Sequence, residues 1–235
     1  FEESNLLDKY GLNDKKEGFV SVVEIACLLH DIGNPPFGHF GEEAINLWGK
    51  EVVSELFKAS YSKEKDCNKI IRDLTYFEGN AQGLRVLHSL QSLNLTYSQL
   101  ACLLKYTRGA WQEKPSHDNP FKYRKKKPGF YLTEEQLVKN IYSALSIKDG
   151  CRFPLTYIME AADDISYCIA DLDDAIDKGI LSIDELHNHI KNTWSDFRVK
   201  NETVIDENYL PKIADIAYQK YKNEKYNKNH VYILT

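Results

Sequence analysis

An adjacent imidazole and carboxylate, His30 and Asp31, end an apolar helical stretch early in the sequence. Neighbouring side chains point about 100° apart on a helix, so they can share one target only near a helix end or across a groove. Neutral imidazole nitrogen and carboxylate oxygen together suit Mg, Mn, Fe, Ni or Zn. Leu28 and Leu29 are expected to anchor this helix end in the core. The pair predicts a divalent metal site, although an isolated His-Asp pair is more often an ordinary surface pair.

A rigid turn follows the pair and leads to a second imidazole and a second carboxylate. Residues 33–38 read Gly-Asn-Pro-Pro-Phe-Gly, and His39 and Glu42 come directly after them. Proline fixes the backbone angle φ, and glycine permits close backbone approach. A rigid turn that holds two more polar groups near a metal is what a hydrolytic site needs.

The elements that must position these residues are helical. Apolar residues recur at steps of three and four over the segment that ends at His30 and again after Glu42. Further helices are expected over the ranges 64–74, 80–92, 97–106, 134–147, 155–178, 183–198 and 207–222. Capping-box sequences occur at Thr96 to Gln99, Thr133 to Gln136 and Ser182 to Glu185. Because the only strand candidates are 131–132 and 231–234, we expect an all-α fold with at most a minor hairpin.

A second dense group of polar residues lies on the expected helix 155–178. Asp163, Tyr167 and Asp171 are spaced by four residues and form one stripe on a helix face. Ile165 is expected on the core side of the same helix. The acidic stripe needs no explanation if it faces solvent, but it would cost free energy if it were buried without partners. Small residues beside Asp163 permit close packing there, which makes the solvent interpretation weaker for this residue.

The region 107–132 differs from the rest in being rich in proline, lysine and aromatic residues. A loop of this length in a compact domain is often functional or disordered. Its run of basic residues at 122–127 is more typical of a solvated face. The alternative is a basic arm over an anion or a nucleic acid.

The composition is that of a soluble globular protein. The 235 residues are 43% hydrophobic and 28% charged, and the net charge of −5 gives no general preference for nucleic acid. Five scattered cysteines without a Cys-x-x-Cys pair favour a reducing, cytoplasmic setting. No run approaches the ~18 apolar residues of a membrane span. The chain begins with Phe1 and ends on an apolar run, so we expect it to be an excerpt of a longer protein.

Four segments make the chain resemble the HD-domain phosphohydrolases, and more closely the bacterial dGTP triphosphohydrolases. They are residues 30–42, 77–83, 104–108 and 160–167, in the same order as in the family. The resemblance implies one HD-type helical domain over 1–235, with 107–132 as a loop insertion. It also implies hydrolysis of dGTP to deoxyguanosine and triphosphate, with Mg²⁺ or Mn²⁺ as the cofactor.

The resemblance assigns roles to individual positions. It makes His30, Asp31 and Asp163 metal ligands, and it makes His39 and Glu42 the catalytic pair. At a spacing of three residues, Glu42 can orient His39 and raise its basicity for proton transfer; a histidine that only caps the turn is the alternative. The family pattern has a further His ligand upstream, and no His precedes His30 here. The expected substrate contacts are Asn80, Lys105, Tyr106, Tyr167 and Asp171.

The substrate contacts divide by chemistry. Lys105 supplies a point charge for phosphate, and Asn80 supplies a neutral donor. Tyr167 can pack on the deoxyribose, and Asp171 can accept a hydrogen bond from its 3′-hydroxyl. The alternative for Tyr106 and Tyr167 is aromatic core packing.

Two other functions stay open beside dGTP hydrolysis. One is an HD-domain phosphohydrolase that acts on other dNTPs or on a cyclic or alarmone nucleotide. The other is a non-catalytic regulator that binds nucleotides or single-stranded DNA, which the mixture of aromatic and basic residues at 107–131 supports. The resemblance also implies a homo-oligomer, a hexamer in this family. The sequence does not indicate which base the protein selects.

Overall fold

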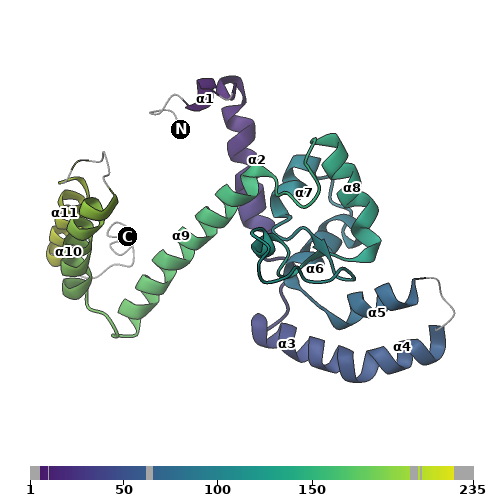
Figure 1. Cartoon of the computed structure of the whole chain (residues 1–235). Coiled ribbons are helices and arrows are strands. Elements are labelled where there is room, and N and C mark those ends of the chain that lie inside the picture. The colour runs from purple at the N-terminus through teal and green to yellow at the C-terminus, as the bar shows by residue number, and fades with distance from the viewer. Residues whose placement is uncertain (1–5, 10, 62–65, 202–205, 207, 225–235) are drawn as a thin grey trace. The chain divides into compact units, whose positions relative to one another are not determined.

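The computed structural model describes residues 6–9, 11–61, 66–201, 206 and 208–224 (Figure 1). The chain divides into two compact units, Phe1–Ala161 and Ala162–Thr235, which are described separately. Across the described residues, no helix combines the length and the apolar character needed to cross a bilayer. The expected strand at 231–234 lies outside the described residues.

The first unit is built from helices, as the apolar periodicity predicts, and the all-α fold class is confirmed. Its helices are α1 (Leu6–Lys9), α2 (Lys16–Leu29), α3 (His39–Trp48), α4 (Ser54–Tyr61), α5 (Cys67–Thr75), α6 (Gly79–Arg85), α7 (Tyr97–Leu103), α8 (Glu135–Ala144) and the start of α9 (Pro154–Asp177). Turns of π-helix at Gly49–Val53 and Val86–Leu90 continue α3 and α6. In Figure 1, α5 runs beside α3 and α4 and contacts both.

The described residues hold one small sheet, which joins the two ends of the 107–132 region. Strand β1 (Arg108–Gly109) pairs in parallel with β2 (Pro128–Phe130), so the pair is not the expected hairpin. A Cβ at Gly129 would lie 1.7 Å from the carbonyl oxygen of Tyr106, and only glycine permits this approach. Residues 131–132 lie after β2, and Leu132 instead begins a short 3₁₀ helix, Leu132–Glu134.

Two apolar clusters form the core of the first unit. One joins α6, α7, β2 and α8 through Leu84, Leu100, Leu104, Phe130 and Ile141. The other joins α2, α7 and α9 through Ala26, Leu87, Leu103 and Met159.

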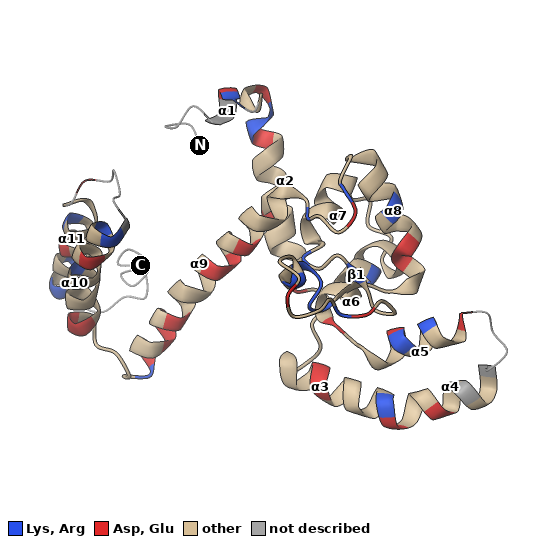
Figure 2. Cartoon of the chain, viewed as in Figure 1, with Lys and Arg blue, Asp and Glu red and all other residues tan. Residues whose placement is uncertain are grey.

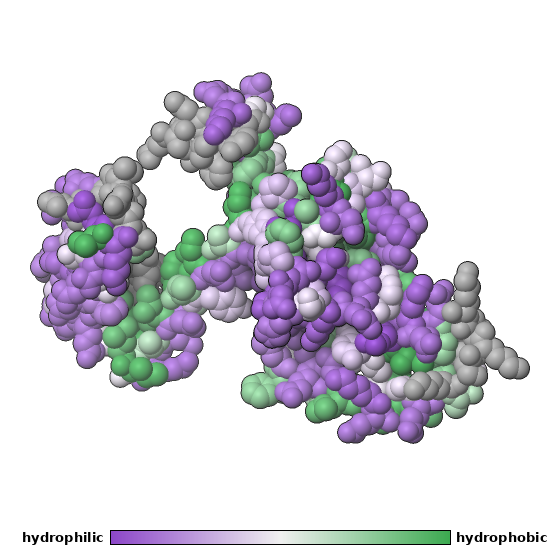
Figure 3. Space-filling view, viewed as in Figure 1, coloured by the Kyte–Doolittle hydropathy of each residue, from purple (hydrophilic) through white to green (hydrophobic). Residues whose placement is uncertain are grey.

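The expectation that Leu28 and Leu29 both anchor the end of α2 in the core is wrong for Leu28. Leu29 packs against the second cluster, whereas Leu28 is 83% exposed. The two side chains point about 100° apart, so only one of them can face α7. Exposed apolar side chains also recur on α3 and α4, at Phe40, Trp48 and Leu56, and green patches lie among purple ones on this part of the surface in Figure 3.

The predicted helix starts are confirmed at two of three capping boxes. Thr96 and Gln99 exchange both capping hydrogen bonds at the start of α7. The predicted box at Thr133 and Gln136 is wrong, because the N-cap of α8 is Glu134. The hydroxyl of Thr133 instead donates to Oε1 of Glu134 at 2.8 Å, since that fully buried carboxylate needs donors.

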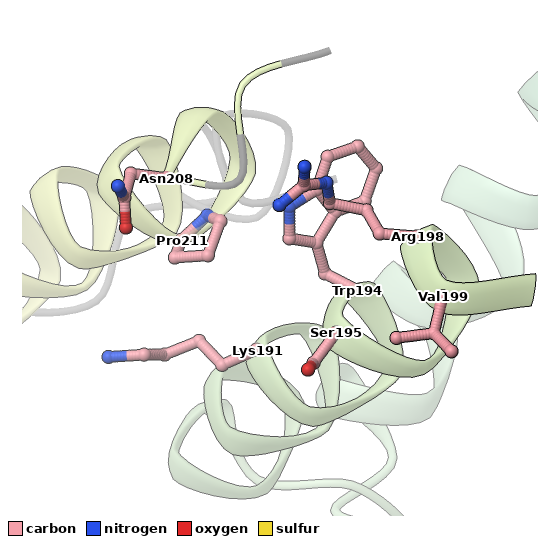
Figure 4. A pocket seen from close by; sticks show the side chains of 7 residues that line it. All are labelled: Lys191, Trp194, Ser195, Arg198, Val199, Asn208 and Pro211. Carbon is pink, nitrogen blue, oxygen red and sulfur yellow. The ribbon is translucent and has the colours of Figure 1, made fainter. Parts of the chain in front are cut away.

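The second unit contains the rest of α9 with α10 (Ile183–Asn201) and α11 (Tyr209–Glu224). Ser182 and Glu185 form the predicted capping box before α10. The buried residues Leu186, Ala214 and Ala217 pack α10 against α11. A cavity of about 440 Å³ between these helices is lined by side chains that include Lys191, Trp194 and Asn208 (Figure 4).

Candidate active site

The imidazole of His30 is oriented by a backbone carbonyl at the end of α2. His30 follows the last residue of α2, and its backbone N–H donates to Ala26 O at 2.9 Å. Nδ1 lies 2.8 Å from Cys27 O, and a carbonyl only accepts, so Nδ1 carries the proton. In the neutral ring this leaves the lone pair on Nε2, which lies 3.5 Å from Oδ1 of Asp31. A histidine whose second nitrogen donates to a carbonyl is the arrangement that metal-ligating histidines use.

The turn after Asp31 packs directly on the backbone of α6. A Cβ at Gly33 would lie 2.1 Å from both Gly79 O and Gly83 N, so glycine is required for this contact. Phe37 has a φ of +65°, which is unusual for a bulky residue and costs free energy. Gly38, with a φ of +52°, then leads into α3. The turn is thus fixed by contacts to a distant part of the chain.

His39 and Glu42 form a hydrogen-bonded pair on the first turn of α3. Nδ1 of His39 lies 3.1 Å from Oε2 of Glu42, so Nδ1 donates and Nε2 can exchange a proton. The other oxygen of Glu42, Oε1, accepts the backbone N–H of Gly79 at 2.8 Å. The side chain of Glu42 is only 11% exposed, whereas that of His39 is 88% exposed. A fixed carboxylate therefore holds an imidazole that substrate can reach.

Two charged residues that sequence reasoning did not single out complete this arrangement. Glu78 precedes α6 and is only 3% exposed. Nζ of Lys127 lies 3.0 Å from Oε2 of Glu78 and 3.5 Å from Oε2 of Glu42. Desolvation acts to lower the pKa of Lys127, but the two carboxylates outweigh it and raise the pKa, so the ammonium stays charged. Glu78 lies inside segment 77–83, one of the four segments that resemble the family. Its position between an apolar residue and a glycine was the sequence signal that could have identified it.

Asn80 lies beside this network, and Lys105 lies in a second one. Nδ2 of Asn80 donates to Oε1 of Glu78 at 2.7 Å. Nζ of Lys105 lies 3.3 Å from Oε1 of Glu160, whose other oxygen accepts from Nη1 of Arg152 at 2.6 Å. Two cations thus share one carboxylate, and the local excess of positive charge suits a phosphate.

Tyr106 is buried, and burial raises the pKa of its hydroxyl. Lys126 lies above its ring, with Nζ 5.8 Å from the ring centre. This burial agrees with the alternative of core packing, and the substrate contact of Tyr106 stays a prediction.

The three expected site residues on α9 lie in the second unit, which is described by itself. Asp163 is half-buried and Asp171 is exposed. Tyr167 is 55% exposed, so core packing does not describe it, and Ile165 is likewise exposed instead of facing the core. Figure 2 shows the acidic residues recurring along this helix. The roles of Asp163, Tyr167 and Asp171 stay predictions.

A cavity beside the His39–Glu42 pair is lined by charges of both signs. It measures about 460 Å³, and its lining includes three lysines, Lys50, Lys114 and Lys127, and three glutamates, Glu42, Glu43 and Glu78. The lysines offset the carboxylates around the exposed imidazole, which lowers the cost of bringing an anionic substrate there. Within the described part of the chain, no three His, Cys, Asp or Glu side chains lie close enough together to hold a metal ion.

Comparison with known proteins places this site in a family. Residues 4–117 match the HD domain. The chain belongs to the HD-domain phosphohydrolases. An HD domain implies the use of a divalent metal, and the donor chemistry of His30 and Asp31 described above fits one. The family resemblance predicted from the sequence is thus confirmed.

The curated relatives of this HD-domain protein include deoxyguanosinetriphosphate triphosphohydrolases. The chain is 48% identical over 214 residues to the protein of Enterobacter sp. (strain 638). The aligned region covers 82% of this chain and 42% of that protein. The chain is 49% identical over 218 residues to the protein of Yersinia pseudotuberculosis serotype O:3, covering 83% and 42%. The chain therefore spans less than half the length of these relatives.

Proposed function

We propose that this HD-domain phosphohydrolase hydrolyses dGTP to deoxyguanosine and triphosphate with Mg²⁺ or Mn²⁺. The observation that carries the proposal is the His39–Glu42 pair, whose exposed imidazole lies 3.1 Å from a buried carboxylate at the edge of a cavity. The activity for which the curated relatives are named supports dGTP as the substrate.

The metal would be held by His30, Asp31 and Asp163. When bound, such an ion polarises a phosphoryl group and lowers the pKa of a water molecule. Water adds to the α-phosphorus, and the bond between phosphorus and the 5′-oxygen breaks. Nε2 of His39 transfers the proton that deoxyguanosine needs at that oxygen, because Glu42 keeps the proton of Nδ1 engaged.

The remaining residues bind and orient the nucleotide. Lys105 neutralises phosphate charge, and the lysines of the cavity add to the same field. Asn80 donates to the phosphates, and Tyr106 is a further contact to the nucleotide. Tyr167 packs on the deoxyribose, and Asp171 accepts from the 3′-hydroxyl.

Product analysis tests the proposal. The purified protein is incubated with each dNTP and with cyclic and alarmone nucleotides, in Mg²⁺ and in Mn²⁺, and the products are separated by ion-exchange chromatography. Deoxyguanosine and triphosphate are the expected products from dGTP. Release of orthophosphate or diphosphate instead, or turnover only with another nucleotide, contradicts it. Sedimentation velocity on the same sample tests the proposed homo-oligomer, a hexamer.

A single-stranded DNA-binding regulator is the second candidate. Nε of Arg124 donates to the hydroxyl of Tyr123 at 2.9 Å, and its guanidinium lies 4.4 Å from the ring centre of Phe121. Both rings are exposed, and exposed rings with cations can stack bases and hold phosphates. Salt-dependent binding of a single-stranded oligonucleotide by a protein that turns over no nucleotide favours this candidate.

A further inference from the structure

One oxygen of Glu42 meets both an imidazole and an ammonium group. Oε2 lies 3.1 Å from Nδ1 of His39 and 3.5 Å from Nζ of Lys127. The two groups compete for the negative charge of the same atom. A carboxylate that shares its charge with a lysine attracts a protonated imidazole less strongly than one that does not.

Glu78 opposes this effect of Lys127. Its two oxygens lie 3.0 and 3.3 Å from Nζ of Lys127, so most of the ammonium charge is directed to Glu78. Glu78 is itself fixed by two hydrogen bonds. Nδ2 of Asn80 donates to its Oε1 at 2.7 Å, and the backbone N–H of Glu78 donates to the hydroxyl of Tyr131 at 3.1 Å. Lys127 therefore lies between one carboxylate that contacts His39 and one that does not.

We infer that Lys127 is a positioning residue for the proposed hydrolysis, because, balanced by Glu78, it sets how strongly Glu42 attracts the protonated imidazole of His39. The inference rests on the proposed function for its catalytic consequence. Neither Lys127 nor Glu78 needs to touch the substrate. The other charged groups that line the same cavity are Glu43, Lys50 and Lys114.

The charges predict opposite effects for the two partners. Lys127→Met removes a positive charge, so Glu42 attracts protonated His39 more strongly. Glu78→Gln removes a negative charge and keeps the shape of the side chain. The ammonium group of Lys127 then interacts mainly with Glu42, which weakens the attraction between Glu42 and protonated His39. The double variant removes one charge of each sign and restores the balance. A residue that only supports the fold would lower activity in both single variants without moving them in opposite directions.

The test measures kcat/KM for dGTP against pH in the whole protein with saturating Mg²⁺. The alkaline limb, which reports loss of the His39 proton that the leaving oxygen needs, is expected to move by ~0.5 pH unit to higher pH in Lys127→Met and to lower pH in Glu78→Gln. It is expected to stay near wild type in the double variant, and the exposure of His39 keeps the shifts small. Lys127→Arg keeps the charge and is expected to rescue the wild-type profile. Lys139→Met is the matched control, since Lys139 pairs with Glu135 on the surface of α8.

A second measurement separates this inference from the proposed function. The ring protons of His39 are followed by NMR against pH in the same variants, with His39→Gln for assignment. Opposite displacements of the His39 titration in the two single variants support the inference even if dGTP is not hydrolysed, an outcome that overturns only the proposed function. Displacements in the same direction, or none in a folded Lys127→Met variant, overturn the inference.

Discussion

Oε1 of Glu42 accepts the backbone N–H of Gly79 at 2.8 Å, which fastens the first turn of α3 to the first residue of α6. The contact leaves no space at Gly79, where a Cβ would lie 3.0 Å from that oxygen and 2.2 Å from Oδ1 of Asn34. The two residues are 37 positions apart, yet this hydrogen bond decides where the carboxylate of the proposed catalytic pair lies.

Gly79→Ala is expected to displace both Asn34 and Glu42. Forced overpacking costs ~1–3 kcal/mol of unfolding free energy, and we expect kcat to fall by roughly tenfold or more because positioning is lost. Urea unfolding and initial rates measure the two effects. Gly18→Ala is the control, because nothing lies within 4 Å of its Cβ position and alanine favours the helix α2. Equal effects from both substitutions would contradict the assignment.

His39→Ala is expected to lower kcat by ~10²–10⁴-fold, the usual contribution of a general acid or base. The affinity for Mn²⁺, measured by isothermal titration calorimetry, should stay within about a factor of two, because the substitution leaves the proposed metal ligands unchanged. His117→Ala is a matched control, since His117 is exposed on the 107–132 loop, where its Nδ1 lies 3.2 Å from Nζ of Lys122. Undiminished turnover in His39→Ala would remove His39 from the mechanism.

Asp73 predicts a pH dependence of stability. Burial raises its pKa from 3.8 to about 6, against an opposing hydrogen bond from the Leu132 N–H. The folded protein therefore holds this proton more tightly than the unfolded chain, so the contribution of Asp73 to stability falls as pH rises from about 4 to 6.

Asp73→Asn removes this loss. The variant is expected to exceed wild type by ~1–2 kcal/mol at pH 7.5, a value reduced for partial exposure, and to lose this advantage near pH 4. Urea unfolding at both pH values measures it. The exposed Asp118→Asn serves as the control. An advantage for Asp73→Asn that is equal at both pH values would contradict the argument.

Leu28 and Leu87 are a matched pair for testing the core. Leu87 is 1% exposed in the cluster that α2 joins, whereas Leu28 projects from α2 into solvent. Leu87→Ala is expected to cost ~2–5 kcal/mol of unfolding free energy, and Leu28→Ala less than ~0.5 kcal/mol. Thermal unfolding of both variants checks this. A similar loss in Leu28→Ala would show that its side chain is covered in solution.

Local features of the fold were predictable because their determinants lie within a few residues. Helix α9, expected over 155–178, spans Pro154–Asp177, and α10, expected over 183–198, begins at Ile183. The pairing of His39 with Glu42 follows in the same way from one helical turn. The box at Thr133 failed because a buried carboxylate competed for the hydroxyl.

The sequence by itself determined the helical class and the family, whereas the metal-ligand roles of His30 and Asp31 stay predictions. Only the tertiary structure decided that Glu78 and Lys127, 49 residues apart, meet beside Glu42. The physical reason is range. Helical periodicity and capping act over three or four neighbours, whereas burial and ion pairing depend on which distant segments fold against each other.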